Sequence, residues 1–346
     1  RVTLDLTGLP PSPEEVEAIR KSYADHFPGH SLDDDLNKNL GKDQLKEAKA
    51  SMAGDNVAAA VQSLRTAKNG TLFGNCDREQ VSKVLEGITD PKQRAEVAKQ
   101  VGPEILGSLS GNDRALVEAQ LAGDTAKANA VKIDEAMHSG VFGGGGFLGT
   151  GLGQDKEAVY KALESSGSEE ERKKLKDAYA QKTGQDLGSA LSGNFSGTES
   201  DIAKNLLAGD KAGASAARVK LATEGFFFTD KDAIYKQMEG KKPEERQAMV
   251  DAYNKAYGKG PDGKNFDATL QDNLSGLDLT KAKQLEKDGK LDDAFALNYA
   301  MHGSWWSSDK EAMKSTLAGK SKAEIDALCT KYQKDYGIDL RKEITD

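Results

Sequence analysis

Cysteine, tryptophan, histidine and long apolar runs are scarce in this chain, and each scarcity removes a class of protein. Among 346 residues there are 2 cysteines, 2 tryptophans and 4 histidines. The two cysteines, Cys76 and Cys329, are too few for the disulfide framework of a small secreted domain. No apolar run approaches the roughly 18 residues that a membrane-spanning helix needs. We therefore expect a soluble or peripheral membrane protein.

Positive charge is also in short supply. The chain has 48 Lys and Arg against 56 Asp and Glu, a formal net charge of −8. Proteins that coat nucleic acid use Lys and Arg to neutralise phosphates, so no nucleic-acid partner is expected. Aromatic residues make up only 6%, which argues against a large sheet and predicts an all-α fold. The chain begins at Arg1 and no basic and apolar leader follows, so we expect a processed or excised piece in which no targeting signal can be read.

A repeat organises the residues that are present. Four predicted helix starts share Asp, then a base, then an acid, and begin at residues 77, 155, 230 and 309, with spacings of 78, 75 and 79. Apolar residues stand four and eight positions after each Asp, the stripe of an amphipathic helix. These pairs are Val81 and Leu85, Val159 and Leu163, Ile234 and Met238, and Met313 and Leu317.

A second predicted helix follows each of these and carries its own marker. It opens at residues 90, 168, 242 and 321, and eleven residues after its first position lie Val101, Tyr179, Tyr253 and Tyr332. Leu-Ser-Gly then recurs at 109–111, 191–193 and 274–276, and Ala-Gly-Asp turns at 53–55, 122–124 and 208–210 precede the closing helix. Gly suits the end of one helix and Asp the cap of the next.

The repeat therefore predicts an array of five-helix units of about 75 to 79 residues, three complete and two partial. The predicted boundaries are 1–70 for a partial repeat, 71–140, 141–225 with a Gly-rich loop insertion, 226–303, and 304–346 for a second partial repeat.

Two stretches of this array resemble the annexins. Residues 293–303 read D-A-F-A-L-N-Y-A-M-H-G, similar to the annexin pattern D-A-x-x-L-x-x-A-M-K-G. Residues 151–159 read G-L-G-Q-D-K-E-A-V, similar to G-L-G-T-D-E-x-x-I. The resemblance implies a curved all-α array that binds an anionic phospholipid membrane through Ca²⁺. In that family the loop before the first helix of a unit offers backbone carbonyls to the ion, and here those would come from Gly149, Gly151 and Gly153.

The family completes its calcium site with a carboxylate next to a Leu-Thr/Ser-Gly segment, and this chain departs from that pattern. The residues before the Leu are Asn39, Ser108, Ala190 and Asn273. The nearest acids are Asp113, Glu199, Asp201 and Asp278. Asp113 and Asp278 are interpreted more simply as helix caps.

The segments between a closing helix and the next opening helix hold much of the scarce aromatic content. The residues predicted to contact a membrane are Leu72, Phe73, Phe147, Leu148, Phe226, Phe227, Phe228, Trp305 and Trp306. Trp is favoured at a bilayer interface, so these loops can enter it if they share one face. Two other interpretations remain: the loops fold inward as core, or they form a protein interface.

The sequence gives little support for dinucleotide binding or for catalysis. Residues 144–149 match G-x-G-x-x-G, but a dinucleotide site needs a preceding strand, whereas this segment follows a predicted helix. No Ser or Cys nucleophile has a base beside it, so no catalytic residue is predicted and the chain is not expected to be an enzyme. The sequence predicts a peripheral phospholipid-binding module, and the missing carboxylates leave its dependence on calcium open. The alternative is a calcium-independent scaffolding domain of a larger protein, with the aromatic loops against a protein partner.

Overall fold

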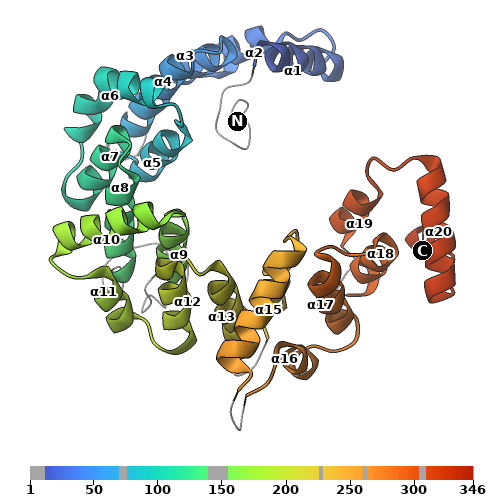
Figure 1. Cartoon of the computed structure of the whole chain (residues 1–346). Helices are drawn as coiled ribbons and strands as arrows, with labels where there is room; N and C mark the ends of the chain where they lie inside the picture. Colours follow the sequence, from blue (N-terminus) through green and yellow to red (C-terminus); the bar gives the residue numbers. More distant parts are fainter. Residues whose placement is uncertain are drawn as a thin grey trace. The chain divides into compact units, whose positions relative to one another are not determined.

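The computed structural model describes residues 12–69, 76–138, 155–225, 229–259, 263–303 and 309–345. All regular secondary structure in these residues is helical, which confirms the all-α fold class (Figure 1). The chain forms two compact units, Arg1–Ala190 and Leu191–Asp346. The boundary between them falls inside one helix, α11, and therefore inside the predicted repeat 141–225.

Within the first unit the helices follow the predicted order of opening, second, third, fourth and closing helix, except that the repeat starting at α5 lacks the predicted third helix. It contains α1 (Pro13–His26), α2 (Leu32–Asn39), α3 (Lys42–Met52), α4 (Asn56–Asn69), α5 (Arg78–Gly87), α6 (Pro91–Leu106), α7 (Gly111–Ala122), α8 (Thr125–His138), α9 (Lys156–Glu164), α10 (Glu169–Thr183) and the start of α11 (Leu187–Asn194).

The second unit continues the same order. It contains α12 (Gly197–Ala208), α13 (Lys211–Thr223), α14 (Lys231–Lys236), α15 (Pro243–Tyr257), α16 (Phe266–Asn273), α17 (Gly276–Asp288), α18 (Asp293–His302), α19 (Lys310–Leu317), α20 (Lys322–Tyr336) and α21 (Leu340–Thr345). The opening helices are thus α5, α9, α14 and α19, and the closing helices are α4, α8, α13 and α18.

One repeat is simpler than its sisters. Between α5 and α8 the structure has only α6 and α7, because a turn stands where the others have a third helix. Only 8 residues separate Val101 from Leu109, whereas 21 separate Tyr253 from Leu274 in the later repeat that contains α16. The shorter connection has no room for two further helical turns.

The opening helices begin where the sequence predicts, and for the expected reason. Asp77, Asp155, Asp230 and Asp309 are N-caps, and each carboxylate accepts a hydrogen bond from the backbone N–H three residues later, at 2.9 to 3.0 Å. Each cap satisfies one of the unpaired N–H groups of the first turn. The apolar stripe behind them is buried in three of the four helices, and Met313 and Leu317 of α19 are half-buried.

The hydrophobic cores are offset from the sequence repeat by one helix. One core joins residues of the closing helix α4 with α5, α6 and α7; its members include Leu64, Leu85, Val101 and Val117. The equivalent core of the second unit joins α13 with α14, α15, α16 and α17. A closing helix therefore completes the core of the repeat that follows it.

One buried arginine holds the fourth helix of its repeat against the second. Arg246 of α15 is only 5% exposed, and its guanidinium donates to the carbonyls of Glu286, Lys287 and Lys241 at 2.8, 2.6 and 2.5 Å. The turn after α17 has Gly289 at φ 68°, where a Cβ would lie 2.5 Å from Arg246 Nη1. The glycine is required both by its backbone and by the arginine beside it.

Replacing Arg246 by Leu should lower the free energy of unfolding by ~2–4 kcal/mol, because buried carbonyl oxygens lose their donors. Urea unfolding followed by circular dichroism measures the change. The matched control is Arg172→Leu, at the equivalent place in α10, where the one bond goes to the Gly167 carbonyl at an exposed position. Equal effects of the two substitutions would contradict the role given to Arg246.

Candidate functional site

A repeated hydrogen bond defines the junction between each closing helix and the next opening helix. The backbone N–H of the capping Asp donates to an Ala carbonyl in the last turns of the closing helix. The pairs are Asp77 to Ala67 at 2.8 Å, Asp155 to Ala136 at 3.1 Å, Asp230 to Ala222 at 2.9 Å and Asp309 to Ala300 at 2.7 Å. The segment between the two helices therefore leaves and re-enters the fold at equivalent points in every repeat.

The residues predicted to contact a membrane or a metal fall in those segments. All of Leu72, Phe73, Phe147, Leu148, Gly149, Gly151, Gly153, Phe226, Phe227, Phe228, Trp305 and Trp306 lie outside the described residues. Their roles stay predictions. What the structure describes is the pair of helix ends on either side of each segment.

The fourth helices of three repeats carry an acid near their start, and here the structure corrects the register expected from the sequence. The helices α7, α12 and α17 begin with Gly111, Gly197 and Gly276, all near φ 55°. Residues 191–193 lie within α11, so the true counterpart of 109–111 is the segment 195–197, Phe-Ser-Gly. With this register an acid occupies the third position of each helix: Asp113, Glu199 and Asp278.

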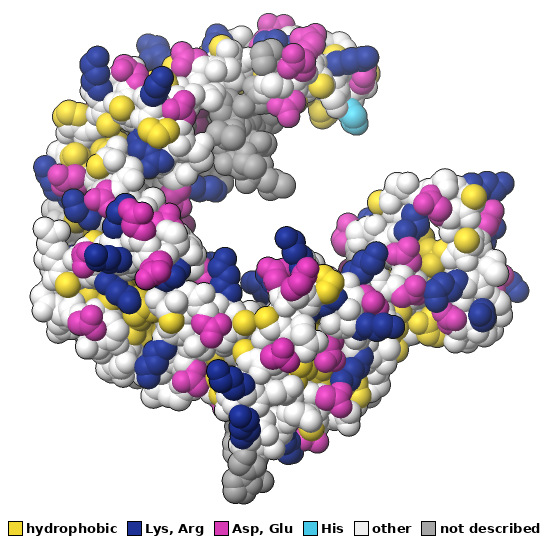
Figure 2. Space-filling model, in the orientation of Figure 1, with side chains coloured by type: hydrophobic (Ala, Val, Ile, Leu, Met, Phe, Trp, Pro, Cys, Tyr) yellow, Lys and Arg dark blue, Asp and Glu magenta, His cyan; other side chains and the backbone are white. Residues whose placement is uncertain are grey.

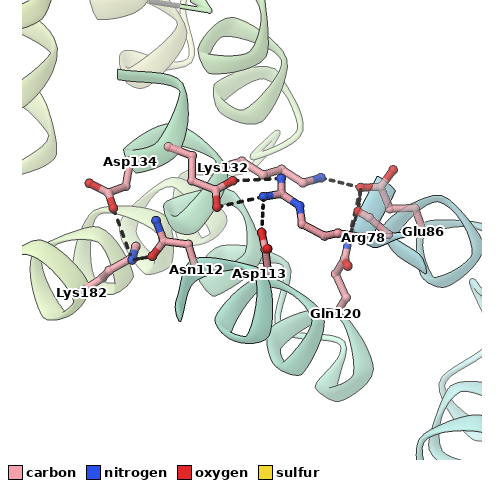
Figure 3. Close-up of polar contacts among 10 residues, drawn as sticks. Arg78, Glu86, Asn112, Asp113, Gln120, Lys132, Asp134 and Lys182 are labelled. Carbon is pink, nitrogen blue, oxygen red and sulfur yellow. Dashed lines mark hydrogen bonds and ion pairs between the residues drawn. The ribbon is translucent and has the colours of Figure 1, made fainter. Parts of the chain in front are cut away.

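In the repeat that starts at α5, the acid binds the base that follows the capping Asp. Arg78 Nη1 donates to Asp113 Oδ1 at 2.7 Å, and the same guanidinium bonds both oxygens of Glu135 of α8 at 3.0 Å (Figure 3). Burial alone would lower the pKa of Arg78, but the two carboxylates outweigh it and raise that pKa. The interpretation of Asp113 as a helix cap is therefore wrong, since its side chain reaches across to α5.

Further polar contacts join neighbouring helices of this unit, and Figure 3 draws them. Lys132 binds Glu86 at 2.5 Å, and Gln120 donates to Glu86 at 3.2 Å. On the other side, Lys182 of α10 donates to Asn112 at 2.7 Å and pairs with Asp134 at 3.3 Å. Four helices of the first unit, α5, α7, α8 and α10, are thus joined by polar contacts.

The equivalent acid of the second unit, Asp278, has three donors. Its Oδ1 accepts from the hydroxyls of Tyr235 at 3.1 Å and Tyr299 at 2.8 Å, and its Oδ2 pairs with Lys231, the base after the capping Asp. The Lys281 ammonium lies over both tyrosine rings, 4.4 and 4.3 Å from their centroids. The interpretation of Asp278 as a cap is wrong for the same reason as for Asp113.

The charges of this cluster perturb one another. Burial alone would raise the pKa of Asp278, but hydrogen bonds from Lys231 and Tyr299 contribute most to lowering it, and the net pKa lies below its ordinary value. Burial and the bond to Asp278 raise the pKa of Tyr299 to about 12. The last of the nearby acids, Asp201, accepts a hydrogen bond from the Tyr257 hydroxyl at 3.0 Å.

The described side chains do not fit a calcium ion. Ca²⁺ takes six to eight oxygen ligands, and a base paired with a carboxylate competes with the ion for its oxygens. Asp113 and Asp278 are each paired with a base, and the part of the chain that the structure describes contains no group of three or more His, Cys, Asp or Glu residues able to hold a metal.

Together, the helix order, the junctions and the offset cores define an all-α repeat protein. No known protein family profile matches the chain. It is 28% identical over 207 residues to annexin A13 of Mus musculus, covering 56% of this chain and 62% of that protein. With the repeat order and the two motif stretches, this identity makes the chain a divergent annexin-like protein. It spans less than two-thirds of that relative's length.

Solved annexin structures also align with the chain. A point mutant of annexin A8 with an intact N-terminus is 18% identical and annexin III is 18% identical; they cover 83% and 84% of this chain and 89% and 88% of their own, with TM-scores of 0.30 and 0.29. A calcium-bound annexin (Sm)1 is 17% identical over 84% of this chain and 86% of its own, with a TM-score of 0.29. Among the described helices, none is long and apolar enough to cross a membrane.

Replacing Asp278 by Asn tests the electrostatics of the second cluster. A carboxyl whose pKa is lowered by folding stabilises the protein above the unfolded pKa of ~3.9, and that contribution is lost as pH falls through the folded pKa. We therefore expect Asp278→Asn to be less stable than the parent at pH 7, with the difference shrinking below pH ~4. Urea unfolding at a series of pH values measures it.

The control for that series is Asp272→Asn on α16, where the carboxylate pairs with Lys264 and its side chain is 46% exposed. This exposed pair should contribute little at any pH. A difference between Asp278→Asn and the parent that stays constant from pH 7 to pH 3 would show that the carboxylate acts through packing and not through charge.

Proposed function

We propose that this chain is a peripheral phospholipid-binding module that meets the bilayer with the segments joining closing and opening helices. The annexin-like sequence supports membrane binding as the class of function. We choose these segments because of the junction hydrogen bond, which fixes both ends of each segment at equivalent points of the repeats. Those segments hold both tryptophans of the chain and the Phe-Phe-Phe run at 226–228.

The charge of the surface decides what kind of contact is needed. Basic and acidic side chains alternate over the visible face of both units (Figure 2), and the chain as a whole carries −8. An anionic leaflet repels such a protein at long range. Binding must therefore draw on apolar burial by the junction segments, about 25 cal/mol for each Å² removed from water, or on an ion that bridges the two surfaces.

Co-sedimentation with vesicles of phosphatidylserine and phosphatidylcholine tests the proposal. We expect the full chain to pellet with the vesicles, and the double substitution Trp305→Ser with Trp306→Ser to weaken binding by at least about tenfold, since burial of one large apolar side chain contributes about 1.5–3 kcal/mol. Running each sample with calcium and with a chelator separates bridging by the metal from direct apolar contact.

The matched control is Phe27→Ser, which removes an aromatic side chain that is 53% exposed at the end of α1, away from any junction segment in sequence. It should leave vesicle binding unchanged. Failure of the parent chain to pellet under either condition would reject the membrane function and favour the scaffolding alternative. A large fall in melting temperature for the Trp variant would instead assign the pair to the core.

A further inference from the structure

We propose that Arg78 is a built-in counter-ion for Asp113 and Glu135, and that its guanidinium takes the place a divalent cation would otherwise occupy between these carboxylates. The three side chains come from three helices, α5, α7 and α8, of the same repeat. Figure 3 shows Arg78 and Asp113 facing each other. The inference concerns the metal dependence of the function proposed above, and its test uses metal binding alone.

The geometry of the cluster supports a shared cation. Arg78 Nη1 lies 2.7 Å from Asp113 and 3.0 Å from Glu135, and Nη2 lies 3.0 Å from the second oxygen of Glu135. One positive charge thus faces two negative charges from different helices. Without it, two carboxylates would lie on either side of one guanidinium-sized space, and each would disfavour ionisation of the other.

Partial burial makes the compensation necessary. The side chains are 36% exposed for Arg78, 48% for Asp113 and 22% for Glu135. Two carboxylates at such a site have to be matched by a cation, because charges that lose water without a partner are costly. A guanidinium meets this need with a planar fork of donors that fits two carboxylates.

The backbone also holds Arg78 beside the two carboxylates that it neutralises. Arg78 is the first residue of α5, directly after the capping Asp77, whose own N–H is bonded to Ala67. Its position is therefore set by the junction, and its effective concentration at the carboxylates exceeds that of a free ion. A free cation has to displace a side chain that is already in place.

The second unit repeats the device with other side chains. Lys231 is likewise the first residue of its opening helix and pairs with the acid at the third position of the fourth helix, Asp278. The residue corresponding to Glu135 is Tyr299, since each directly precedes the Ala of the junction bond, and its hydroxyl donates to Asp278. In both units, therefore, a base at the start of the opening helix pairs with the acid of the fourth helix, where a metal would otherwise be expected.

Calcium titration by calorimetry of the full chain, without lipid, tests the proposal. We expect Arg78→Met to gain one equivalent of bound Ca²⁺ relative to the parent, because Asp113 and Glu135 lose their cation. Arg78→Lys keeps a cation at the site and should leave the stoichiometry unchanged. Lys132→Met is the matched control, since it removes one positive charge from a separate ion pair between α8 and α5, the pair with Glu86.

The possible results of this titration distinguish the proposal from its alternatives. An Arg78→Met variant that keeps its helical circular dichroism but gains no site would overturn the proposal, as would an equal gain in Lys132→Met. Should Arg78→Met fail to fold, the double variant Asp113→Asn with Glu135→Gln decides: it should titrate like the parent, and loss of a calcium site from it would show that these carboxylates already bind metal. Neither result depends on whether vesicles bind.

Discussion

Each closing helix has to pack against two sets of neighbours at once, and the rest of the architecture depends on this. In the first unit α8 meets α7 through Ala128 and Val131, while the carbonyl of Ala136 in its last turns receives the N–H that starts α9. Small side chains let a helix approach partners on both sides, as the Ala-rich closing helices require. Because the core of one repeat needs the closing helix of the repeat before it, single repeats are not independent folding units.

The polar clusters join neighbouring helices at their ends, as the hydrophobic cores join them along their faces. Arg246 satisfies the carbonyls at the end of α17, and Arg78 joins the starts of α5 and α7 to the end of α8. Both arginines have partners on other helices, so they fix the angles between elements as well as adding stability. Surface charges of the same number spread over exposed helix faces would contribute far less.

Much of this fold could be predicted from sequence because local patterns of residues specify it. The Asp caps, the apolar stripes and the spacing of about 75 to 79 residues each depend on residues close together in the chain, and the structure confirms them. The register of the third repeat could not be predicted, because Leu191-Ser192-Gly193 matches the marker by chance and lies inside the helix α11. Only the backbone, with Gly197 at φ 54°, distinguishes the true helix start.

The ion pairs could not be predicted from local sequence patterns either. Arg78 and Asp113 are 35 residues apart, and an acid near the start of a helix fits a cap as well as a distant partner. One signal was present: a base directly follows the capping Asp in all four repeats, and in three of the fourth helices an acid stands two residues after the first Gly. Joining the two required the knowledge that opening and fourth helices lie side by side.

The junction bond also bears on how such an array can change over time. The chain between the bonded Ala and Asp advances by 10, 19, 8 and 9 positions in the four repeats, yet the same two groups meet. Closing a longer loop costs only ~0.6 kcal/mol for each doubling of its length. The junctions are therefore places where the chain tolerates insertion and replacement, so one scaffold can present segments of different length and composition while its helices keep their register.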